Sequence, residues 1–160
     1  MVSVYLICVG KLKEKFYLDA CQEYLKRLKG YCKLTLVEIP EAKLPQSPSL
    51  GEIAAALDKE GEAIRAKMPP GGTLVALCVE GQEKSSPELA EFVQTFQNSG
   101  GKHLVFLIGG SYGLHPSIKA EAKLRLSMSP MTFPHHLARV MVLEQIYRAF
   151  KINEGSSYHK

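Results

Sequence analysis

The chain has 160 residues, of which 46% are hydrophobic and 22% are charged, and its formal net charge is +4. These values are typical of one ordinary globular domain, so we expect a single domain over residues 1–160. No apolar run approaches the roughly 20 residues of a membrane-spanning helix, and the N-terminus lacks the features of a signal peptide. We therefore expect a cytoplasmic protein with no membrane partner.

The charge is unevenly distributed along the chain. The local balances are +3 for residues 1–50, −4 for residues 51–100 and +5 for residues 101–160. Basic flanks around an acidic middle suggest one positive face that could meet a polyanion. Ordinary solvated helix faces are the alternative, and charge runs form these more often.

Strand-like and helix-like segments alternate from one end of the chain to the other. Apolar runs predict strands over residues 2–9, 33–39, 73–79, 104–108 and 127–132. Amphipathic periodicity predicts helices over residues 13–29, 51–67, 85–98, 116–126 and 135–151. Such strict alternation is typical of a parallel sheet covered by helices, so the expected fold class is α/β.

Local signals support several of these boundaries. Ser49 and Glu52 have the spacing of a capping box before the second helix. Ser85 and Pro87 open the third helix, and Pro116 stands near the first position of the fourth.

The last helix carries more apolar side chains than one sheet-facing stripe requires. They are Leu137, Val140, Met141, Leu143, Ile146, Tyr147 and Phe150. The surplus indicates either a subunit interface or a helix that its own domain buries, and the sequence favours neither.

A glycine-rich segment, Gly109-Gly110-Ser111-Tyr112-Gly113, directly follows the fourth strand. Glycines at such a position let the backbone turn sharply and approach a ligand, because no Cβ intervenes. The segment is not a P-loop, which needs a Lys beside the glycines, and it lacks the spacing of a dinucleotide fingerprint. A purely structural turn is the alternative for such glycines.

The segment Met128-Ser129-Pro130-Met131-Thr132-Phe133 is apolar but is interrupted by hydroxyls and a proline. It can offer backbone donors and acceptors beside apolar walls, which suits an adenine ring better than a phosphate. An edge strand with Pro130 at a bulge is the competing interpretation. Because open α/β sheets bind ligands beyond the carboxyl ends of their strands, this segment and the glycine-rich one could line a single pocket.

The other reactive side chains indicate neither a metal centre nor hydrolytic chemistry. His135 and His136 follow Pro134 without further ligands at metal-binding spacing, so helix capping or an RNA contact is the better interpretation. The four cysteines form no C-x-x-C pair and are expected to be reduced thiols that pack as small hydrophobic side chains. The polar C-terminus would by default be frayed.

Several motifs together resemble one known family. They are Leu107-Ile108-Gly109-Gly110, Gly113-Leu114, Leu126-Ser127, Ser129, Met131-Thr132-Phe133-Pro134-His135, Arg139-Val140, Glu144-Gln145-Ile146-Tyr147-Arg148-Ala149-Phe150 and Tyr158-His159-Lys160, with the run Asp58-Lys59-Glu60-Gly61-Glu62. Over essentially its whole length the chain resembles the RlmH family. The members of that family are 23S rRNA pseudouridine N3-methyltransferases of the SPOUT class.

The resemblance carries expectations that periodicity alone does not supply. It implies a parallel-sheet α/β/α SPOUT fold with a C-terminal trefoil knot, and it implies a homodimer. It implies S-adenosylmethionine as cofactor, held by Leu77, Gly109, Met128, Ser129, Pro130, Met131, Thr132 and Phe133. It also implies that the substrate is a pseudouridine in a stem-loop of 23S rRNA, recognised on the assembled ribosome.

The resemblance also motivates a hypothesis for the catalytic residues. The N3 imide of the base is weakly acidic and must lose its proton before or during methyl transfer. We expect Tyr158 and His159 to fold over the RNA base in the dimer, with His159 orienting the base or accepting the proton. Arg139 and Arg148 would contact phosphate or stabilise the imidate. For Arg148, an ion pair with Glu144 one helical turn away is the alternative.

Two other functions stay open. A SPOUT methyltransferase could act on another RNA such as tRNA, and a ribosome-associated dimer could bind RNA without catalysis. The glycine-rich segment and the C-terminal motif argue against the second. A nicotinamide-dependent dehydrogenase is disfavoured, because no acidic residue stands about 20 residues beyond the glycines to hold a ribose.

Overall fold

The computed structural model describes residues 1–159, in which strands and helices alternate. The strands are β1 (Ser3–Val9), β2 (Lys33–Ile39), β3 (Thr73–Glu83), β4 (His103–Ile108) and β5 (Leu124–Ser127). The helices are α1 (Lys15–Leu28), α2 (Leu50–Lys67), α3 (Ser86–Asn98), α4 (Pro116–Glu121), α5 (His135–Asn153) and the 3-10 turn η1 (Ser157–His159).

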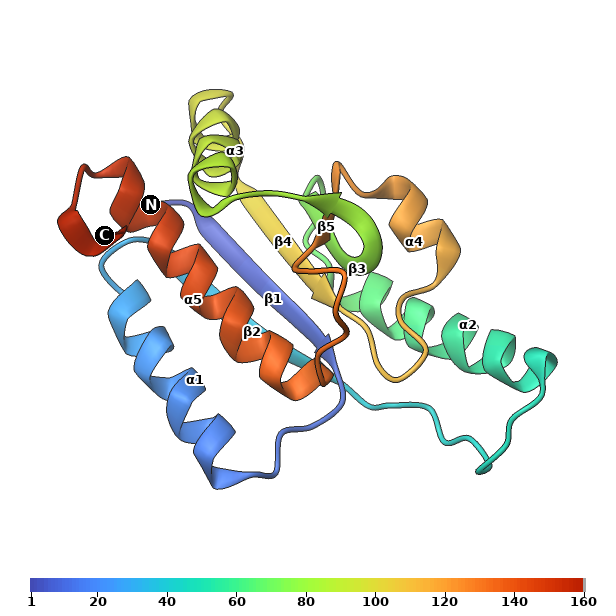
Figure 1. Ribbon diagram of the computed structural model, residues 1–160. Helices are drawn as coiled ribbons and strands as arrows, with labels where there is room; N and C mark the ends of the chain where they lie inside the picture. The colour runs from blue at the N-terminus through green and yellow to red at the C-terminus, as the bar shows by residue number, and fades with distance from the viewer. Residues whose placement is uncertain (160) are drawn as a thin grey trace.

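All five strands belong to one parallel sheet, in the order β2-β1-β4-β3-β5 (Figure 1). The register pairs Ser3 with His103 and Cys8 with Ile108. The carboxyl ends of β1 and β4 are therefore level, and the glycine-rich segment starts beside the turn that follows β1. The predicted parallel α/β fold is confirmed.

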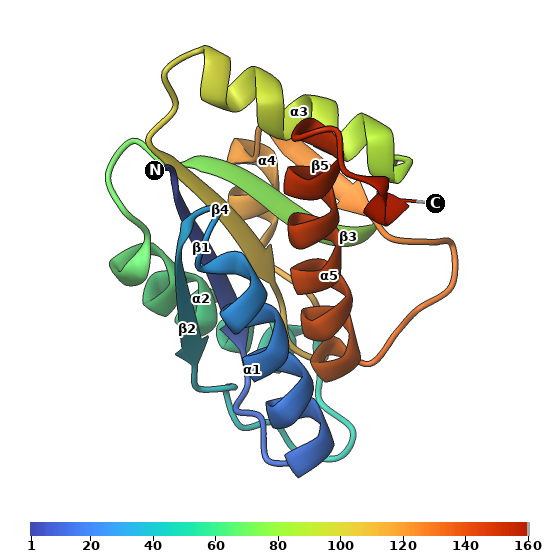
Figure 2. The same ribbon diagram turned by 90° about the vertical axis from the view of Figure 1, so that its left-hand side faces the viewer.

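Helices cover both faces of the sheet. Val4 and Leu6 of β1 are fully buried against a cluster that includes residues of α1, α3 and α5. Ile7 and Val9 are buried on the other face, with residues of α2 and α4. Figure 2 shows the sheet between these two helical layers. The alternation of side chains along β1 thus builds the expected three-layer α/β/α arrangement.

The N-termini of two helices carry capping boxes, and the one at Ser49 is as the sequence predicts. The Ser49 side chain accepts a hydrogen bond from the Glu52 amide, and the Glu52 side chain accepts one from the Ser49 amide. Ser85 and Glu88 form the same reciprocal pair at α3. Each capping box satisfies two backbone donors that the first helical turn leaves free.

The prediction for residues 116–132 is wrong in part. The helix α4 ends at Glu121 rather than 126, and β5 occupies Leu124–Ser127 rather than residues 127–132. Leu124 and Leu126 are buried while Arg125 between them is exposed, which is the period of a strand. The segment after Ser127 is a loop rather than a strand.

The third strand runs beyond its predicted end at residue 79, to Glu83. Its pairing with β5 shifts between Leu77 and Gln82, so the residues between them bulge away from the ladder. A Cβ at Gly81 would lie 2.7 Å from the Arg125 carbonyl oxygen, so only glycine fits this close approach.

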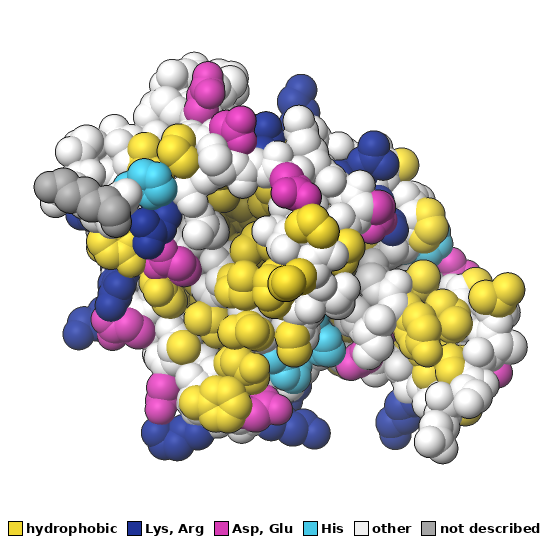
Figure 3. Space-filling model, viewed as in Figure 1, with side chains coloured by type: hydrophobic (Ala, Val, Ile, Leu, Met, Phe, Trp, Pro, Cys, Tyr) yellow, Lys and Arg dark blue, Asp and Glu magenta, His cyan; other side chains and the backbone are white. Residues whose placement is uncertain are grey.

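The last helix, α5, lies beside both α1 and α3, on the same face of the sheet as these two helices (Figures 1 and 2). Its fully buried apolar side chains are Val142, Leu143, Ile146, Ala149 and Phe150. Leu137, Val140, Met141 and Tyr147 are only half-buried. Figure 3 shows apolar side chains gathered over this region, with most Lys and Arg at the margin. The domain therefore buries one apolar stripe of α5 fully, whereas the other apolar side chains of this helix stay partly exposed.

The four cysteines are free thiols. Burial raises the pKa of Cys8 and of Cys32 to about 12, so both stay protonated at neutral pH. Cys8, Cys21 and Cys32 pack in the core as predicted, whereas Cys78 is half-buried. Among the described residues, no helix has both the length and the apolar character of a membrane span.

Candidate ligand pocket at the carboxyl ends of the strands

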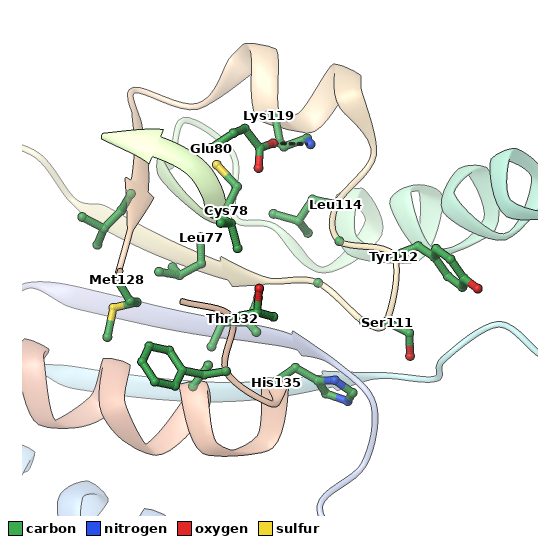
Figure 4. A pocket seen from close by; sticks show the side chains of 18 of the residues that line it. Leu77, Cys78, Glu80, Ser111, Tyr112, Leu114, Lys119, Met128, Thr132 and His135 are labelled. Atoms are coloured by element: carbon green, nitrogen blue, oxygen red, sulfur yellow. Dashed lines mark hydrogen bonds and ion pairs between the residues drawn. The ribbon is translucent and has the colours of Figure 1, made fainter. Parts of the chain in front are cut away.

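A cavity of about 270 Å³ opens beside the bulge of β3 and beyond the carboxyl ends of β4 and β5. Its walls come from the bulged part of β3, the loop after β4, the loop after β5, Lys119 of α4 and the first turns of α5 (Figure 4). The two ligand-loop candidates of the sequence thus face one pocket. Every residue expected to hold a cofactor lines it except Pro130, and those residues are Leu77, Gly109, Met128, Ser129, Met131, Thr132 and Phe133.

The loop after β4 folds back tightly on itself. A Cβ at Gly109 would lie 2.3 Å from the carbonyl carbon of Gly113, so a side chain there would collide with backbone. Gly113 has a φ of +79°, and its amide donates to the Gly110 carbonyl at 3.1 Å. The two glycines at the ends of the loop are therefore required by the turn itself, and the turn brings bare backbone to the pocket.

The loop after β5 is held by two serine hydroxyls. Ser127 Oγ donates to the Ser129 carbonyl at 3.1 Å, and the Met131 amide donates to Ser129 Oγ at 3.0 Å. These local bonds give the segment a fixed path although it has no strand partner. Its Met131 side chain is 72% exposed, at the mouth of the cavity.

The walls of the pocket differ in chemistry from one end to the other. Leu77, Leu114 and Met128 provide apolar surface, whereas Glu80 and Lys119 form an ion pair of 2.7 Å at another part of the rim (Figure 4). Such a site suits a ligand with a flat apolar part and a separate polar or charged part. Residues 1–159 contain no group of three or more His, Cys, Asp or Glu side chains that could hold a metal ion.

Two neighbouring imidazoles stand at the start of α5. His135 lines the pocket, and its ring centre lies 4.4 Å from that of His136. Burial, and then the charge of His136, lower the pKa of His135. Of the two interpretations of these histidines, helix capping is wrong, because the capping position is Pro134 and no side chain caps the helix. An RNA contact stays a prediction.

Comparison with known proteins agrees with this geometry. Residues 2–159 match the family model described as "Predicted SPOUT methyltransferase". The chain belongs to the SPOUT methyltransferase family. It is also 44% identical to "Ribosomal RNA large subunit methyltransferase H" of Clostridium acetobutylicum, over 99% of this chain and 100% of that protein. The family that the motifs indicated is confirmed.

Two solved structures share the fold of this SPOUT chain. A "Probable Methyltransferase from Bordetella pertussis Tohama I" has a TM-score of 0.56 at 14% identity, over 92% of this chain and 95% of that one. A "probable methylase family protein from Haemophilus influenzae Rd KW20" has a TM-score of 0.54 at 12% identity, over 95% of this chain and 66% of that one. At such low identity the likeness concerns the fold alone.

Arg139 of the SPOUT chain has a different position from the one expected. It is 1% exposed, and it donates to Glu38 Oε2 at 2.7 Å and to the Gly10 carbonyl at 3.0 Å. Burial raises the pKa of Glu38, but the Arg139 and Leu12 donors outweigh it and the net pKa is lowered. The prediction that Arg139 contacts phosphate or the imidate is wrong for this chain, because its guanidinium is enclosed and joins α5 to β1 and β2.

The C-terminal motif packs on the second half of α5 and is not frayed. The Tyr158 hydroxyl donates to Glu144 Oε2 at 3.0 Å, and Arg148 lies 4.8 Å from the centre of the Tyr158 ring. Arg148 also pairs with Glu144 at 2.7 Å, as the alternative for Arg148 predicted, and lies 3.3 Å from His159 Nδ1. Neither Tyr158 nor His159 lines the pocket of the same chain. Lys160 lies outside the described residues.

Sequence reasoning missed the charged part of the pocket rim, which Glu80 and Lys119 form. Glu80 stands in the bulge of β3, which the sequence signalled only through Gly81, since a glycine inside a strand pattern often marks a bulge.

Proposed function

We propose that this chain transfers a methyl group from S-adenosylmethionine to N3 of a pseudouridine in a stem-loop of 23S rRNA, on the assembled ribosome. The observation that carries the proposal is the pocket formed by the glycine-rich loop and the loop after β5, in a SPOUT chain. The full-length relative named as a ribosomal RNA large subunit methyltransferase supports the choice of substrate class.

The residues of the pocket fit the methyl donor. Leu77, Met128 and Phe133 offer apolar surface to an adenine ring, and the glycine backbone at Gly109 lets the ligand approach closely. Ser129, Pro130, Met131 and Thr132 complete the set that we propose to hold the cofactor. When bound, S-adenosylmethionine supplies a methyl group already activated on its sulfonium. The protein is left with positioning and with removal of a proton.

The pocket of one chain contains neither Tyr158 nor His159, the residues expected to meet the RNA base. We propose that Tyr158 and His159 of a second copy meet the pocket in a homodimer, with His159 orienting the base or accepting the N3 proton. In the single chain these residues are ordered on α5, in a network with Glu144 and Arg148. Burial, and then Glu144, raise the pKa of Tyr158, so its phenol is a neutral donor at pH 7.

The surface of α5 supports the homodimer. Its Leu137, Val140, Met141 and Tyr147 are half-buried. Figure 3 shows an apolar area over this helix, and contiguous apolar areas of this kind typically mark interaction sites. The same proposal includes three further expectations. They are a C-terminal trefoil knot, a positive face that meets the rRNA, and action in the cytoplasm.

The test is mass mapping of 23S rRNA from cells that lack the protein. The proposal predicts the loss of one methyl group from a single pseudouridine. Unchanged rRNA would contradict it. Methyl-transfer assays on ribosomes, free rRNA and tRNA distinguish the alternative substrate. Calorimetry with S-adenosylmethionine distinguishes a non-catalytic RNA-binding dimer, which would show no affinity.

A further inference from the structure

The acidic run Asp58-Lys59-Glu60-Gly61-Glu62 takes no part in lining the pocket. It lies on α2, which covers the opposite face of the sheet from α1, α3 and α5 (Figure 2). Asp58, Glu60 and Gly61 nevertheless contact two segments that adjoin the glycine-rich loop. One is the segment that follows β2, and the other begins just after the loop, at His115.

Glu60 is a nearly buried carboxyl group, 7% exposed. Its Oε2 accepts a hydrogen bond of 2.8 Å from the Ala42 amide, in the segment that follows β2. Burial raises the pKa of Glu60, and the neighbouring charge of Glu41 adds to the shift. A buried carboxyl group is costly unless it is hydrogen-bonded, so this bond fixes the backbone beside Glu41.

Glu41 in turn holds the tip of the glycine-rich loop. Its Oε1 accepts hydrogen bonds from the Ser111 amide at 3.0 Å and from the Ser111 hydroxyl at 2.8 Å. A Cβ at Gly110 would lie 2.9 Å from the same carboxylate oxygen, so the missing side chain leaves room for this contact. Glu41 is separated from Ser111 by 70 positions in the chain, so the bond is purely tertiary.

The far end of the same loop is held from the same part of α2. Asp58 Oδ1 lies 2.8 Å from Nε2 of His115, whose Nδ1 accepts a bond of 3.1 Å from the Ser117 amide. These bonds require the tautomer with the proton on Nε2, which donates to Asp58. A Cβ at Gly61 would lie 3.3 Å from the His115 Cβ, so glycine permits α2 to approach this closely.

We infer that the run 58–62 of α2, acting through Glu41 and His115, is a brace that positions the glycine-rich loop for the methyl donor. Glu41, Glu60 and Asp58 are positioning residues, because none of them needs to touch the donor. This inference rests on the proposed function, since it assumes that the pocket binds S-adenosylmethionine.

The test compares substitutions of Glu41, whose exposed side chain can be changed without disturbing the core. Glu41→Ala removes both bonds to Ser111, and we expect the Kd for S-adenosylmethionine to rise about tenfold, since charge-assisted bonds are among the stronger ones. KM for the donor should rise with it, while kcat at saturating donor and the thermal midpoint stay close to those of the unchanged chain. Glu41→Gln retains an acceptor oxygen and should restore most of the affinity.

The matched control is Glu62→Ala, an exposed glutamate of the same run that makes no hydrogen bond or ion pair within residues 1–159. It should leave the Kd unchanged. The brace would be overturned if Glu41→Ala had the same Kd for S-adenosylmethionine as the unchanged chain. It would also be overturned if Glu62→Ala raised the Kd as much as Glu41→Ala does. A loss of thermal stability in Glu41→Ala without a change in Kd would also overturn it.

Two further measurements keep the outcomes separate. Glu60→Gln preserves the acceptor for the Ala42 amide and should bind the donor normally if the brace works through that bond. If the unchanged chain binds no S-adenosylmethionine in calorimetry, the proposed function itself fails, whereas failure of the brace alone leaves that affinity intact.

Discussion

The donor pocket and the C-terminal motif differ in how far a single chain completes them. The pocket is formed within one chain by β3, the loops after β4 and β5 and the start of α5, and glycine contacts and serine hydroxyls fix the backbones of the two loops. In the C-terminal motif, Tyr158 and His159 pack on α5 outside the pocket of their own chain. The difference fits our proposal that one chain binds the donor and that a second copy completes the acceptor side.

The largest expected effect is that of removing residues 158–160. If the comparison is right, methyl transfer falls by at least about 100-fold, because the groups that orient the base and accept its proton are gone. The Kd for S-adenosylmethionine should change less than about twofold, because the pocket itself is untouched. Methyl-transfer assays and calorimetry on the same preparation measure both, and a fully active truncation would end the hypothesis.

The next effect concerns Arg139, which stabilises the part of α5 beside the pocket. Arg139→Ala removes an enclosed guanidinium and leaves the Gly10 carbonyl without its donor, whereas Glu38 is 36% exposed and keeps the Leu12 amide, so we expect the free energy of unfolding to fall by about 2–3 kcal/mol. Arg148→Ala is the matched control on the same helix, because the Arg148 side chain is 23% exposed whereas Arg139 is 1% exposed, and its loss should cost about 1 kcal/mol or less. Denaturant unfolding measures both, and equal losses would contradict the assigned difference in burial.

Gly109→Ala tests the pocket side of the comparison. The new Cβ must displace the Gly113 backbone, so the Kd for the donor should rise about ten- to 100-fold, as expected for a strain of 1–3 kcal/mol.

The Gly109→Ala variant keeps its C-terminal motif intact and can therefore be mixed with chains that lack the motif. In an equal mixture with chains truncated after residue 157, subunit exchange should restore about a quarter of the activity, since a symmetric dimer offers one intact site in each mixed pair. No recovery in the mixture would show that pocket and motif act within one chain.

The smallest effect is the pH dependence contributed by His135. Its pKa is lowered in the folded chain, so the unfolded chain takes up a proton first as the pH falls. The stabilisation is therefore fully present above the ordinary pKa of 6.5 and is lost as the pH falls below it. His135→Asn should reduce the decline in unfolding free energy between pH 7 and pH 5. An unchanged slope in urea titrations would contradict the burial of this imidazole.

The elements of the fold could largely be read from the sequence because they depend on local patterns. The strict alternation, the capping boxes at Ser49 and Ser85, and the proline at the start of α4 are all signals within a few residues of the structure they specify. The misplaced fifth strand shows the limit of such signals. The apolar Met128 continues the period of Leu124 and Leu126 in β5, and only pairing with β3 determines that the strand ends at Ser127.

The site divides in the same way. The sequence by itself determined which two segments form the pocket, because glycines after one strand and an apolar, hydroxyl-bearing run after another have chemistry that is visible locally. Only the tertiary structure decided that Arg139 is enclosed by Glu38, that Glu80 and Lys119 complete the rim, and that Glu41 holds Ser111. These contacts join residues far apart in the chain, and their partners follow from strand order and helix packing, which no local pattern encodes.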